Sequence, residues 1–214
     1  MIYVKGLIVS SGTITDYNRL KSEVKKADFI ICADGGMNHL IKIEKAPNLV
    51  IGDLDSIRES ALNYIKNNNI PVEKYSSIKD ATDTVLAMEY LIDLGYKEIV
   101  LMGVTGTRQD HTMANIFLLS ILHDKGIKGK IVDDKNIIYL VDDYLKLEYL
   151  EDIYVSIIPL EQEGVIISLK GFFYNLDKKF IKFGSTHGIS NKIIDDFGTI
   201  KINRGRALVF LSKD

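Results

Sequence analysis

The first part of the chain alternates short, continuously apolar runs with segments of helical periodicity, and this alternation limits the fold more than any other feature. Apolar runs of this kind are typical of strands buried on both faces of a parallel sheet. The pattern therefore predicts a mostly parallel α/β sheet, covered by helices, over residues 1–135. We expect its strands at residues 6–12, 28–36, 48–55, 71–77, 98–106 and 129–134.

The helical segments between these strands carry apolar residues on one face, which is typical of helices that pack on a sheet. The first begins after Thr15 or Asp16, either of which suits an N-cap. The segment at 80–95 ends at Gly95, a residue favoured just after a helix. The expected apolar faces of the two later helices are Val85, Met88 and Ile92, and Met113, Ile116, Phe117 and Ile121.

After residue 135 the rhythm changes to short strand-like runs separated by turn residues, with no pattern for a long helix. The stretch Asn203-Arg204-Gly205 resembles a hairpin turn. This half predicts an all-β sandwich or barrel. No linker rich in glycine, proline or serine marks the join between the halves.

Composition excludes several classes of protein. The net charge of −2 does not favour a nucleic-acid binder. Cys32 is the one cysteine, so no disulfide within the chain and no cysteine-based zinc site can form. The apolar runs are too short for a signal peptide or a transmembrane helix. We expect a cytoplasmic protein with no membrane contact.

Polar and acidic residues follow four successive strands, whereas the strands themselves are nearly free of charge. Ligands of open α/β sheets bind outside the carboxyl ends of the strands, where neighbouring strands lie about 4.8 Å apart. The clusters are Asp34, Gly35 and Gly36; Asp53 and Asp55; Lys79, Asp80, Thr82 and Asp83; and Thr105, Gly106, Arg108, Asp110 and His111.

The Asp-x-Asp pair of Asp53 and Asp55 is a weak motif alone, and the acids of the four strand ends together indicate a ligand more strongly. Two like charges about 4 Å apart repel by about 4 kcal/mol at an effective dielectric of about 20, and a strand end needs no such pair for folding. Mg²⁺ takes carboxylate oxygens and bridges them to phosphates, so the converging acids predict a magnesium site. Taken singly, Asp34 also suits a turn, and Asp80 or Asp110 also suits a helix N-cap.

The loop "GVTGTRQDH", residues 103–111, runs from a buried strand into a helix N-terminus. Backbone N–H groups at such a position suit an anion, and Gly103 and Gly106 permit close backbone approach. Arg108 can clamp a phosphate through two donors, or it can pair with Asp110. The two interpretations are compatible, because an aspartate can hold the arginine ready.

Other reactive residues give weaker signals. His39 and His123 lie in helical patterns and are interpreted as structural or solvated. His111 and His187 have no partners at ligand spacing, which disfavours zinc. The chain has no Gly-x-Ser-x-Gly elbow and Cys32 lies inside an apolar strand, which disfavours a nucleophilic hydrolase.

Five segments together resemble the thiamine pyrophosphokinase family, in the family's order. The resemblance covers essentially the whole chain. It implies an N-terminal α/β domain (1–135), a C-terminal β-sandwich domain (136–214) and a homodimer with active sites at the subunit contact. It also implies Mg²⁺-dependent transfer of a pyrophosphoryl group from ATP to thiamine, which yields AMP and thiamine diphosphate. The segments are "ADGGMNHL" (33–40), "IGDLDSI" (51–57), "KDATDTVLA" (79–87), "GVTGTRQDHTMANI" (103–116) and "GSTHGISN" (184–191).

The resemblance also assigns roles to residues. It implies that the metal and the triphosphate are held by Asp53, Asp55 and Asp83. The chain departs from the family at Thr107, where a second glycine is usual, and in having no tryptophan to stack on thiamine. The ATP-side residues would be Asp34, Thr82, Thr105, Arg108 and Asp110, and the thiamine-side residues Ser190, Asn191 and His187, with His187 or a nearby Phe or Tyr as the stacking group.

Two other classes stay open at this point. The run "LVIGDLDSI" also resembles the Asp-x-Asp signature of haloacid-dehalogenase-type phosphatases, although there the motif follows the first strand and here it follows the third. A nucleotide-sensing module without turnover is the second alternative.

Overall fold

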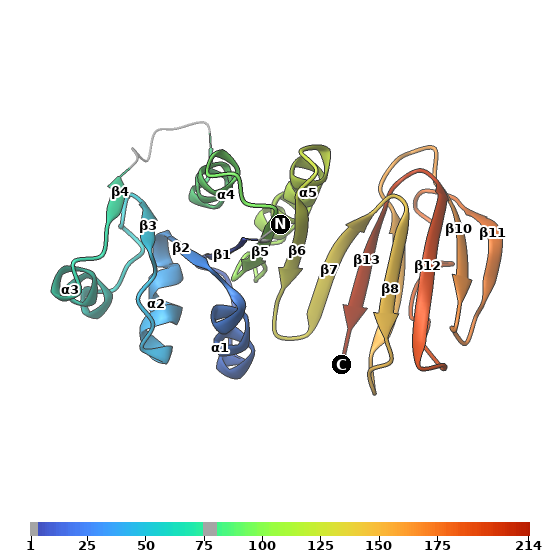
Figure 1. Ribbon diagram of the computed structural model, residues 1–214, viewed down its shortest axis with the longest axis horizontal. Coiled ribbons are helices and arrows are strands. Elements are labelled where there is room, and N and C mark those ends of the chain that lie inside the picture. Colours follow the sequence, from blue (N-terminus) through green and yellow to red (C-terminus); the bar gives the residue numbers. More distant parts are fainter. Residues whose placement is uncertain (1–3, 75–80) are drawn as a thin grey trace. The chain divides into compact units, whose positions relative to one another are not determined.

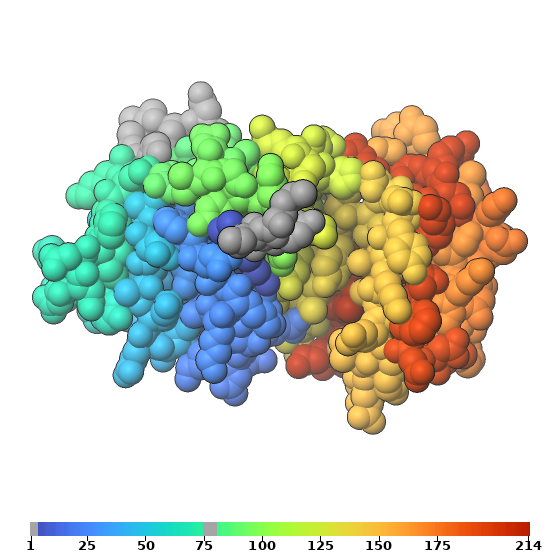
Figure 2. Space-filling view, in the orientation of Figure 1, coloured from blue at the N-terminus to red at the C-terminus, as the bar shows by residue number. Residues whose placement is uncertain are grey.

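The computed structural model describes residues 4–74 and 81–214, and the chain divides into two compact units, Met1–Asp134 and Lys135–Asp214 (Figure 1). Figure 2 shows the same division in space-filling form, with the first unit in blue to green and the second in yellow to red. Lys79 and Asp80, which the sequence placed in the polar cluster after the fourth strand, lie outside the described residues.

The first unit contains a parallel sheet with the strand order β4-β3-β2-β1-β5-β6. Every pairing between these strands is parallel, which confirms the predicted sheet. Strand order reverses where β1 lies beside β5, and such a switch point is the usual ligand site of an open α/β sheet. The strands are β1 (Lys5–Val9), β2 (Phe29–Ala33), β3 (Leu49–Gly52), β4 (Val72–Lys74), β5 (Glu98–Met102) and β6 (Lys128–Val132).

Helices cover both faces of this sheet, with α4 and α5 on one face and α1 and α2 on the other (Figure 1). The helix α1 (Tyr17–Lys26) is capped by Asp16, whose side chain accepts a hydrogen bond from the backbone N–H of Arg19 at 3.0 Å. Of the two predicted N-cap candidates, Thr15 and Asp16, the N-cap is therefore Asp16. The other helices are η1 (Asp34–Gly36), α2 (Met37–Leu40), η2 (Ile41–Ile43), α3 (Glu59–Asn67), α4 (Asp83–Asp93) and α5 (Gln109–Asp124).

The predicted apolar faces of α4 and α5 were partly wrong. Met88 and Ile116 are buried as expected, but Met113, Phe117 and Ile121 are 49%, 48% and 41% exposed. The buried face of α4 is instead Thr84, Ala87, Met88 and Leu91, and that of α5 is Ile116, Leu118, Leu119 and Leu122.

Glycines in the strands decide which face of α4 and of α5 packs against the sheet. A Cβ atom at Gly6 in β1 would lie 2.5 Å from Cδ1 of Leu91, and one at Gly129 in β6 would lie 2.7 Å from Cδ1 of Leu122. The missing side chains leave room for these leucines against the sheet. Because α5 is apolar around most of its circumference, periodicity alone did not identify the contacting face.

The second unit is a β-sandwich, and residues 135–214, all of which are described, contain no helix. One antiparallel set has β13 between β7 and β9, and the other has the order β11-β10-β12-β8. Side chains from both sets, such as Ile157, Ile167 and Val209, form one core around Phe172. The strands are β7 (Asn136–Val141), β8 (Tyr144–Glu148), β9 (Tyr154–Pro159), β10 (Val165–Lys170), β11 (Leu176–Ile181), β12 (Phe197–Arg204) and β13 (Ala207–Ser212).

The hairpin predicted at Asn203-Arg204-Gly205 was wrong. The flanking strands β12 and β13 do not pair with each other, because β12 lies between β10 and β8 whereas β13 lies between β7 and β9. Gly205, with a φ of 85°, turns the chain from one sheet of the sandwich to the other. Among the described residues, no helix is both long and apolar enough to cross a membrane.

Candidate active site

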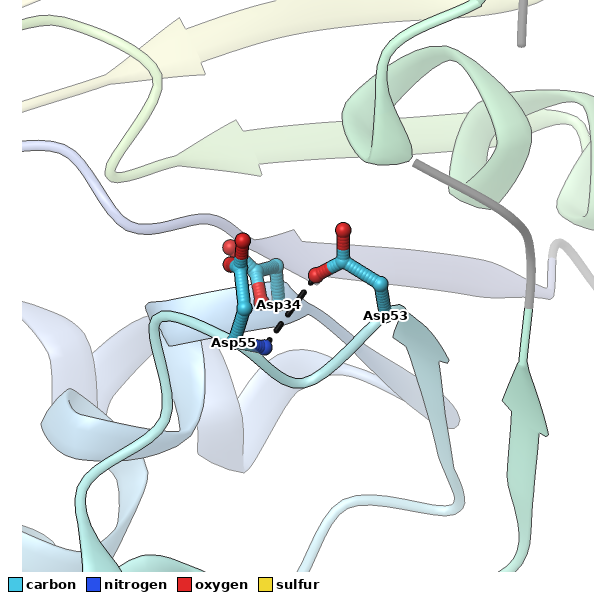
Figure 3. Close-up of side chains that lie close together, drawn as sticks. All are labelled: Asp34, Asp53 and Asp55. Carbon is cyan, nitrogen blue, oxygen red and sulfur yellow. Dashed lines mark hydrogen bonds between the residues drawn. The ribbon is translucent and has the colours of Figure 1, made fainter. Parts of the chain in front are cut away.

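Three carboxylates meet at the carboxyl ends of β2 and β3 (Figure 3). Asp34 follows β2, and Asp53 and Asp55 follow β3; each offers an oxygen within 4.8 Å of the others. We call these three residues the acid cluster. Its position confirms that acids from neighbouring parallel strands converge, as the sequence pattern predicted.

The backbone after β3 is shaped to bring these acids together. Leu54, between the two aspartates, has a φ of 71°, and the Asp55 N–H donates a hydrogen bond to Oδ1 of Asp53 at 3.1 Å. Gly52 has a φ of 146°, and a Cβ atom there would lie 3.2 Å from Cβ of Asp34 and 3.3 Å from Cγ of Asp83. A glycine at position 52 therefore admits both of these acids.

The electrostatics of the acid cluster are unfavourable without a counter-charge. A hydrogen bond with Asp53, together with the negative charges of Asp53, Asp34 and Asp83, raises the pKa of Asp55. Oδ2 of Asp34 accepts a hydrogen bond from the hydroxyl of Ser56, but its Oδ1 is buried and has no hydrogen-bond partner within the described chain. A buried acceptor without a partner calls for an explanation such as an ion.

The membership of the acid cluster differs from the predicted metal-binding set. The prediction grouped Asp53 and Asp55 with Asp83. The three acids whose carboxylate oxygens lie within 4.8 Å of one another are instead Asp53, Asp55 and Asp34. Asp83, the first residue of α4, lies beside Gly52. Thr82 precedes it as the N-cap of α4, with its hydroxyl 3.4 Å from the backbone N–H of Val85.

A cleft of about 420 Å³ lies where the strand order reverses, between the loops that follow β1 and β5. Its walls are rich in hydroxyl groups and backbone, with few apolar side chains. Such a lining suits a polar, phosphate-bearing ligand better than an apolar one. The lining residues are Ser10, Ser11, Gly12, Thr13, Thr84, Gly103, Val104, Thr105, Gly106, Thr107, Arg108, His111, Thr112 and Asn115.

The two loops are joined by their backbones. Gly12 N–H donates to the carbonyl of Gly103 at 2.6 Å, and Thr13 N–H donates to that of Thr105 at 2.8 Å. A Cβ atom at Gly12 would lie 2.4 Å from both carbonyl oxygens, and one at Gly103 would lie 2.2 Å from the Ser10 oxygen. Gly12 and Gly103 are therefore needed for the contact between the two loops, whereas a Cβ atom at Gly106 would lie 3.3 Å from the hydroxyl of Thr13, and the predicted approach of Gly103 and Gly106 to an anion stays a prediction.

Arg108, which lines this cleft, forms an ion pair with Asp110. Nε of Arg108 donates to Oδ1 of Asp110 at 3.2 Å, and its Nη2 donates to Oδ2 at 2.5 Å. The hydrogen bond from Arg108, and a further one from the backbone of His111, lower the pKa of Asp110 to about 2. Arg108 occupies the N-cap position of α5, so Asp110 is not the cap, and its side chain pairs with the arginine instead.

In the second unit, the predicted thiamine-side residues have unequal surroundings. Asn191 is 7% exposed, and its side chain accepts from the N–H groups of Tyr174 and Lys192 and donates to the Tyr174 carbonyl, at 2.8–3.1 Å. Ser190 is exposed, with a φ of 58°. His187 lines a hollow of about 220 Å³, together with Leu169, Tyr174, Leu176, Gly188, Ile189 and Asn191.

Sequence reasoning missed the acids that follow β6. Asp134 accepts hydrogen bonds from the hydroxyl of Thr15 and from the N–H groups of Thr15 and Asp16, the last two at 2.8 and 3.0 Å. Burial raises the pKa of Asp134, but these three bonds outweigh burial and lower it. Its neighbour Asp133 accepts from the hydroxyl of Thr105 at 3.2 Å. The signal was present, because the sixth strand also ends in acids at the same edge of the sheet.

Comparisons with known proteins agree on one family. Residues 20–131 match the family model described as "Thiamin pyrophosphokinase, catalytic domain", and residues 143–206 match "Thiamin pyrophosphokinase, vitamin B1 binding domain". A thiamine pyrophosphokinase of Bacillus subtilis is 32% identical over 188 residues, which cover 86% of this chain and 87% of that protein. One from Caenorhabditis elegans is 25% identical over 184 residues, which cover 82% and 76%.

Solved structures give the same result. The crystal structure of thiamine pyrophosphokinase from Bacillus subtilis superposes with a TM-score of 0.88 at 30% identity, and covers 98% of this chain and 99% of that one. The enzyme from Geobacillus thermodenitrificans gives a TM-score of 0.85 at 28% identity, with 99% and 98% covered.

Proposed function

The chain belongs to the thiamine pyrophosphokinase family and is an enzyme that makes thiamine diphosphate, and we propose that it does so by Mg²⁺-dependent transfer of a pyrophosphoryl group from ATP to thiamine, releasing AMP. The observation that carries this proposal is the acid cluster at the sheet edge that also bears the hydroxyl-rich cleft. The phosphatase and sensing alternatives have no comparable support.

The donors of the acid cluster fit a hard divalent cation. Asp34, Asp53 and Asp55 supply carboxylate oxygens within 4.8 Å of one another, and the buried Oδ1 of Asp34 has no other partner among the described residues. Mg²⁺ bound there would neutralise this charge and that of the transferred phosphates. Asp83, beside Gly52, is placed to support the cluster from the first turn of α4.

We assign ATP to the cleft between the loops that follow β1 and β5. Arg108 is a bidentate donor of the kind that recognises phosphate, and Asp110 fixes its position. Thr105 lines the cleft and is itself oriented by Asp133. With Asp34 and Thr82, these residues form the proposed ATP side of the site.

We assign thiamine to the second unit. Because the chain has no tryptophan to stack on thiamine, we assign this stacking role to Tyr174. The Tyr174 side chain is 64% exposed and borders the same hollow as His187. Phe173 meets Tyr174 edge to face, with ring centroids 4.8 Å apart. A cationic thiazolium is attracted to such a ring. Asn191 acts indirectly, because it holds the backbone of Tyr174, and Ser190 remains a proposed contact.

The exposed aromatic side chains of the second unit support a homodimer with active sites at the subunit contact. Phe172 belongs to the core of the second unit, whereas Phe173, Tyr174, Phe180 and Phe183 are 48–64% exposed. The rings of Phe173 and Tyr174 lie against each other, and exposed apolar groups that adjoin in this way mark an interaction surface. We propose that a second copy of the chain covers them.

The chemistry asks the protein chiefly to position two substrates. The hydroxyethyl oxygen of thiamine loses its proton and forms a bond to the β-phosphorus of ATP, while the bond from that phosphorus to the AMP oxygen breaks, so that AMP and a proton are released. Catalysis of such a transfer comes mainly from alignment and charge neutralisation. Asp53 and Asp55 would together hold the metal ion and, through it, the pyrophosphoryl group, which accounts for two like charges placed so close together.

Product analysis tests the proposal. The protein is incubated with ATP, Mg²⁺ and thiamine, and AMP, thiamine diphosphate and inorganic phosphate are measured, with a control without thiamine. We expect AMP and thiamine diphosphate in equal amounts, and only in the complete mixture. Release of inorganic phosphate would indicate a phosphatase, and unchanged ATP would indicate a sensor.

A further inference from the structure

Two consecutive side chains on the short helix α2 reach different loops of the site. Nδ2 of Asn38 donates to the Ser56 carbonyl at 3.2 Å, and its Oδ1 accepts from the Arg58 N–H at 3.1 Å. Ser56 and Arg58 belong to the segment that follows β3 and begins with Asp53 and Asp55, which we call the acidic loop (residues 53–58). Asn38 therefore fixes the far end of the acidic loop from both a carbonyl and an N–H group.

His39 reaches the opposite way, to the loop that follows β1. Its Nε2 lies 2.8 Å from the carbonyl oxygen of Gly12, and its Nδ1 lies 3.2 Å from the hydroxyl of Tyr17. A carbonyl only accepts, so Nε2 carries the proton and Nδ1 accepts from Tyr17. Lys42 donates to the same hydroxyl at 2.7 Å, which sets the direction of the whole chain of hydrogen bonds. We call residues 10–13 the Gly12 loop.

The helix that carries both side chains is itself held rigidly. Met37 and Leu40, on either side of the pair, are fully buried. Gly36 packs so closely on β1 that a Cβ atom there would lie 2.0 Å from the Val9 carbonyl oxygen. Displacements of α2 are thus restricted by the core, and the two polar side chains extend from a fixed support.

We propose that Asn38 and His39 are positioning residues that set the spacing between the acidic loop and the Gly12 loop. The inference rests on the proposed function, which gives the acidic loop to the metal and the Gly12 loop to the nucleotide. Both side chains bond to loop backbone and neither lies in the apolar core, so their removal should relax the loops and leave the fold in place. Small errors of alignment are costly in a transfer reaction between two bound groups.

The His39 contact is tested with the nucleotide alone. The probe is α,β-methylene-ATP, in which the bond that would break cannot, and its binding is measured by calorimetry without divalent metal. His39→Leu should bind it roughly three- to tenfold more weakly, which corresponds to one lost hydrogen bond. His39→Gln should restore binding, because its amide nitrogen can take the place of Nε2. His123→Leu, at the far end of α5, is the matched control.

The Asn38 contact is tested with the metal alone. Mn²⁺ binding is followed by electron paramagnetic resonance, and Asn38→Leu should weaken it several-fold while leaving metal-free binding of α,β-methylene-ATP unchanged. The exposed Asn63, on α3, provides the control Asn63→Leu. In turnover, His39→Leu should raise KM for ATP and also lower kcat, because the spacing between the two loops is disturbed.

The possible results distinguish the positioning role of Asn38 and His39 from the proposed function. If the wild-type protein binds both probes and the Leu variants bind them equally well, the positioning role is wrong and the proposed function stands. If the wild-type protein binds neither probe, the assignment of the two loops is wrong, and so is the positioning role. If a Leu variant melts before it can be assayed, His39→Asn replaces His39→Leu, because its shorter amide cannot reach Gly12; tight binding by His39→Asn would then contradict the proposal.

Discussion

Asp110 holds Arg108 through two hydrogen bonds, from Nε to Oδ1 at 3.2 Å and from Nη2 to Oδ2 at 2.5 Å, although both side chains are about two-thirds exposed. Two bonds fix the plane of the guanidinium, which one bond would leave free to rotate. An exposed pair of this kind adds little to folding. Its geometry is better explained by a need to present the arginine at the mouth of the cleft.

The substitution Asp110→Asn should therefore raise KM for ATP several-fold and leave the melting temperature unchanged. Steady-state kinetics and a thermal scan measure the two quantities. Arg108→Lys, which keeps the charge and loses the planar fork, should show the same kinetic effect. An unchanged KM in Asp110→Asn would mean that the pair has no part in nucleotide binding.

Glu23 makes the first unit sensitive to acid. Burial opposes its ionisation, but the hydrogen bond from Lys26 and the charges of Lys130 and Lys5 outweigh it and lower the pKa of Glu23 to about 2. Because the folded pKa lies below the ordinary value of 4.5, the ionised group stabilises the fold above pH 4.5. That stabilisation, on the order of 3 kcal/mol, is lost as the pH falls from about 4.5 to about 2.

The variant Glu23→Gln should thus unfold more easily than wild type at pH 7, and the difference should shrink as the pH falls below 4.5. Urea unfolding at several pH values measures it, with the exposed Glu89→Gln as control. If the stability difference stays constant across this pH range, the contribution of Glu23 to stability does not come from its charge.

Asn191 is expected to matter for stability more than for direct contact with thiamine. Its buried amide makes three hydrogen bonds to the backbone of Tyr174 and Lys192. Asn191→Ala should therefore cost about 2–3 kcal/mol in the free energy of unfolding, whereas the exposed Ser190→Ala should change it by less than about 0.5 kcal/mol. Equal stability of Asn191→Ala and wild type would point back to a role in binding.

Mixing two inactive variants tests the proposed subunit contact. An Asp55→Asn subunit has a defective acid cluster, and a Tyr174→Ala subunit has a defective thiamine side. If sites are shared across a twofold dimer, each mixed dimer regains one intact site, and equal mixing should return about a quarter of wild-type activity. Complete subunit exchange with no return of activity would place each site within a single chain.

The strands of the first unit were predictable because their residues are buried on both faces, which leaves a continuous apolar signal. The helix faces were harder, since α5 is apolar on several sides and the glycine at position 129 selects Leu119 and Leu122 for the contact. The prediction of a hairpin at residues 203–205 was wrong for a similar reason. A glycine turn within a sheet and one between two sheets look alike in sequence.

The candidate site shows the same mixture. Convergence of Asp34 with Asp53 and Asp55 follows from parallel pairing of β2 with β3, which the pattern predicted. The distinction between Asp34 and Asp83 depends on local backbone angles that no motif encodes. An asparagine in a motif can bind a ligand or hold a loop, and only the buried contacts of Asn191 separate the two roles.

The central claim is that the acid cluster holds the metal for pyrophosphoryl transfer, and Mn²⁺ binding to Asp53→Asn and Asp55→Asn, measured by electron paramagnetic resonance with thiamine diphosphate formation in the same samples, tests it most directly. We expect both variants to stay folded, with equal or slightly higher melting temperatures because the repulsion within the cluster is relieved. Neither variant should bind Mn²⁺ as the wild type does, and both should lose nearly all turnover. Folded variants that bind Mn²⁺ and make thiamine diphosphate as wild type does would contradict the account.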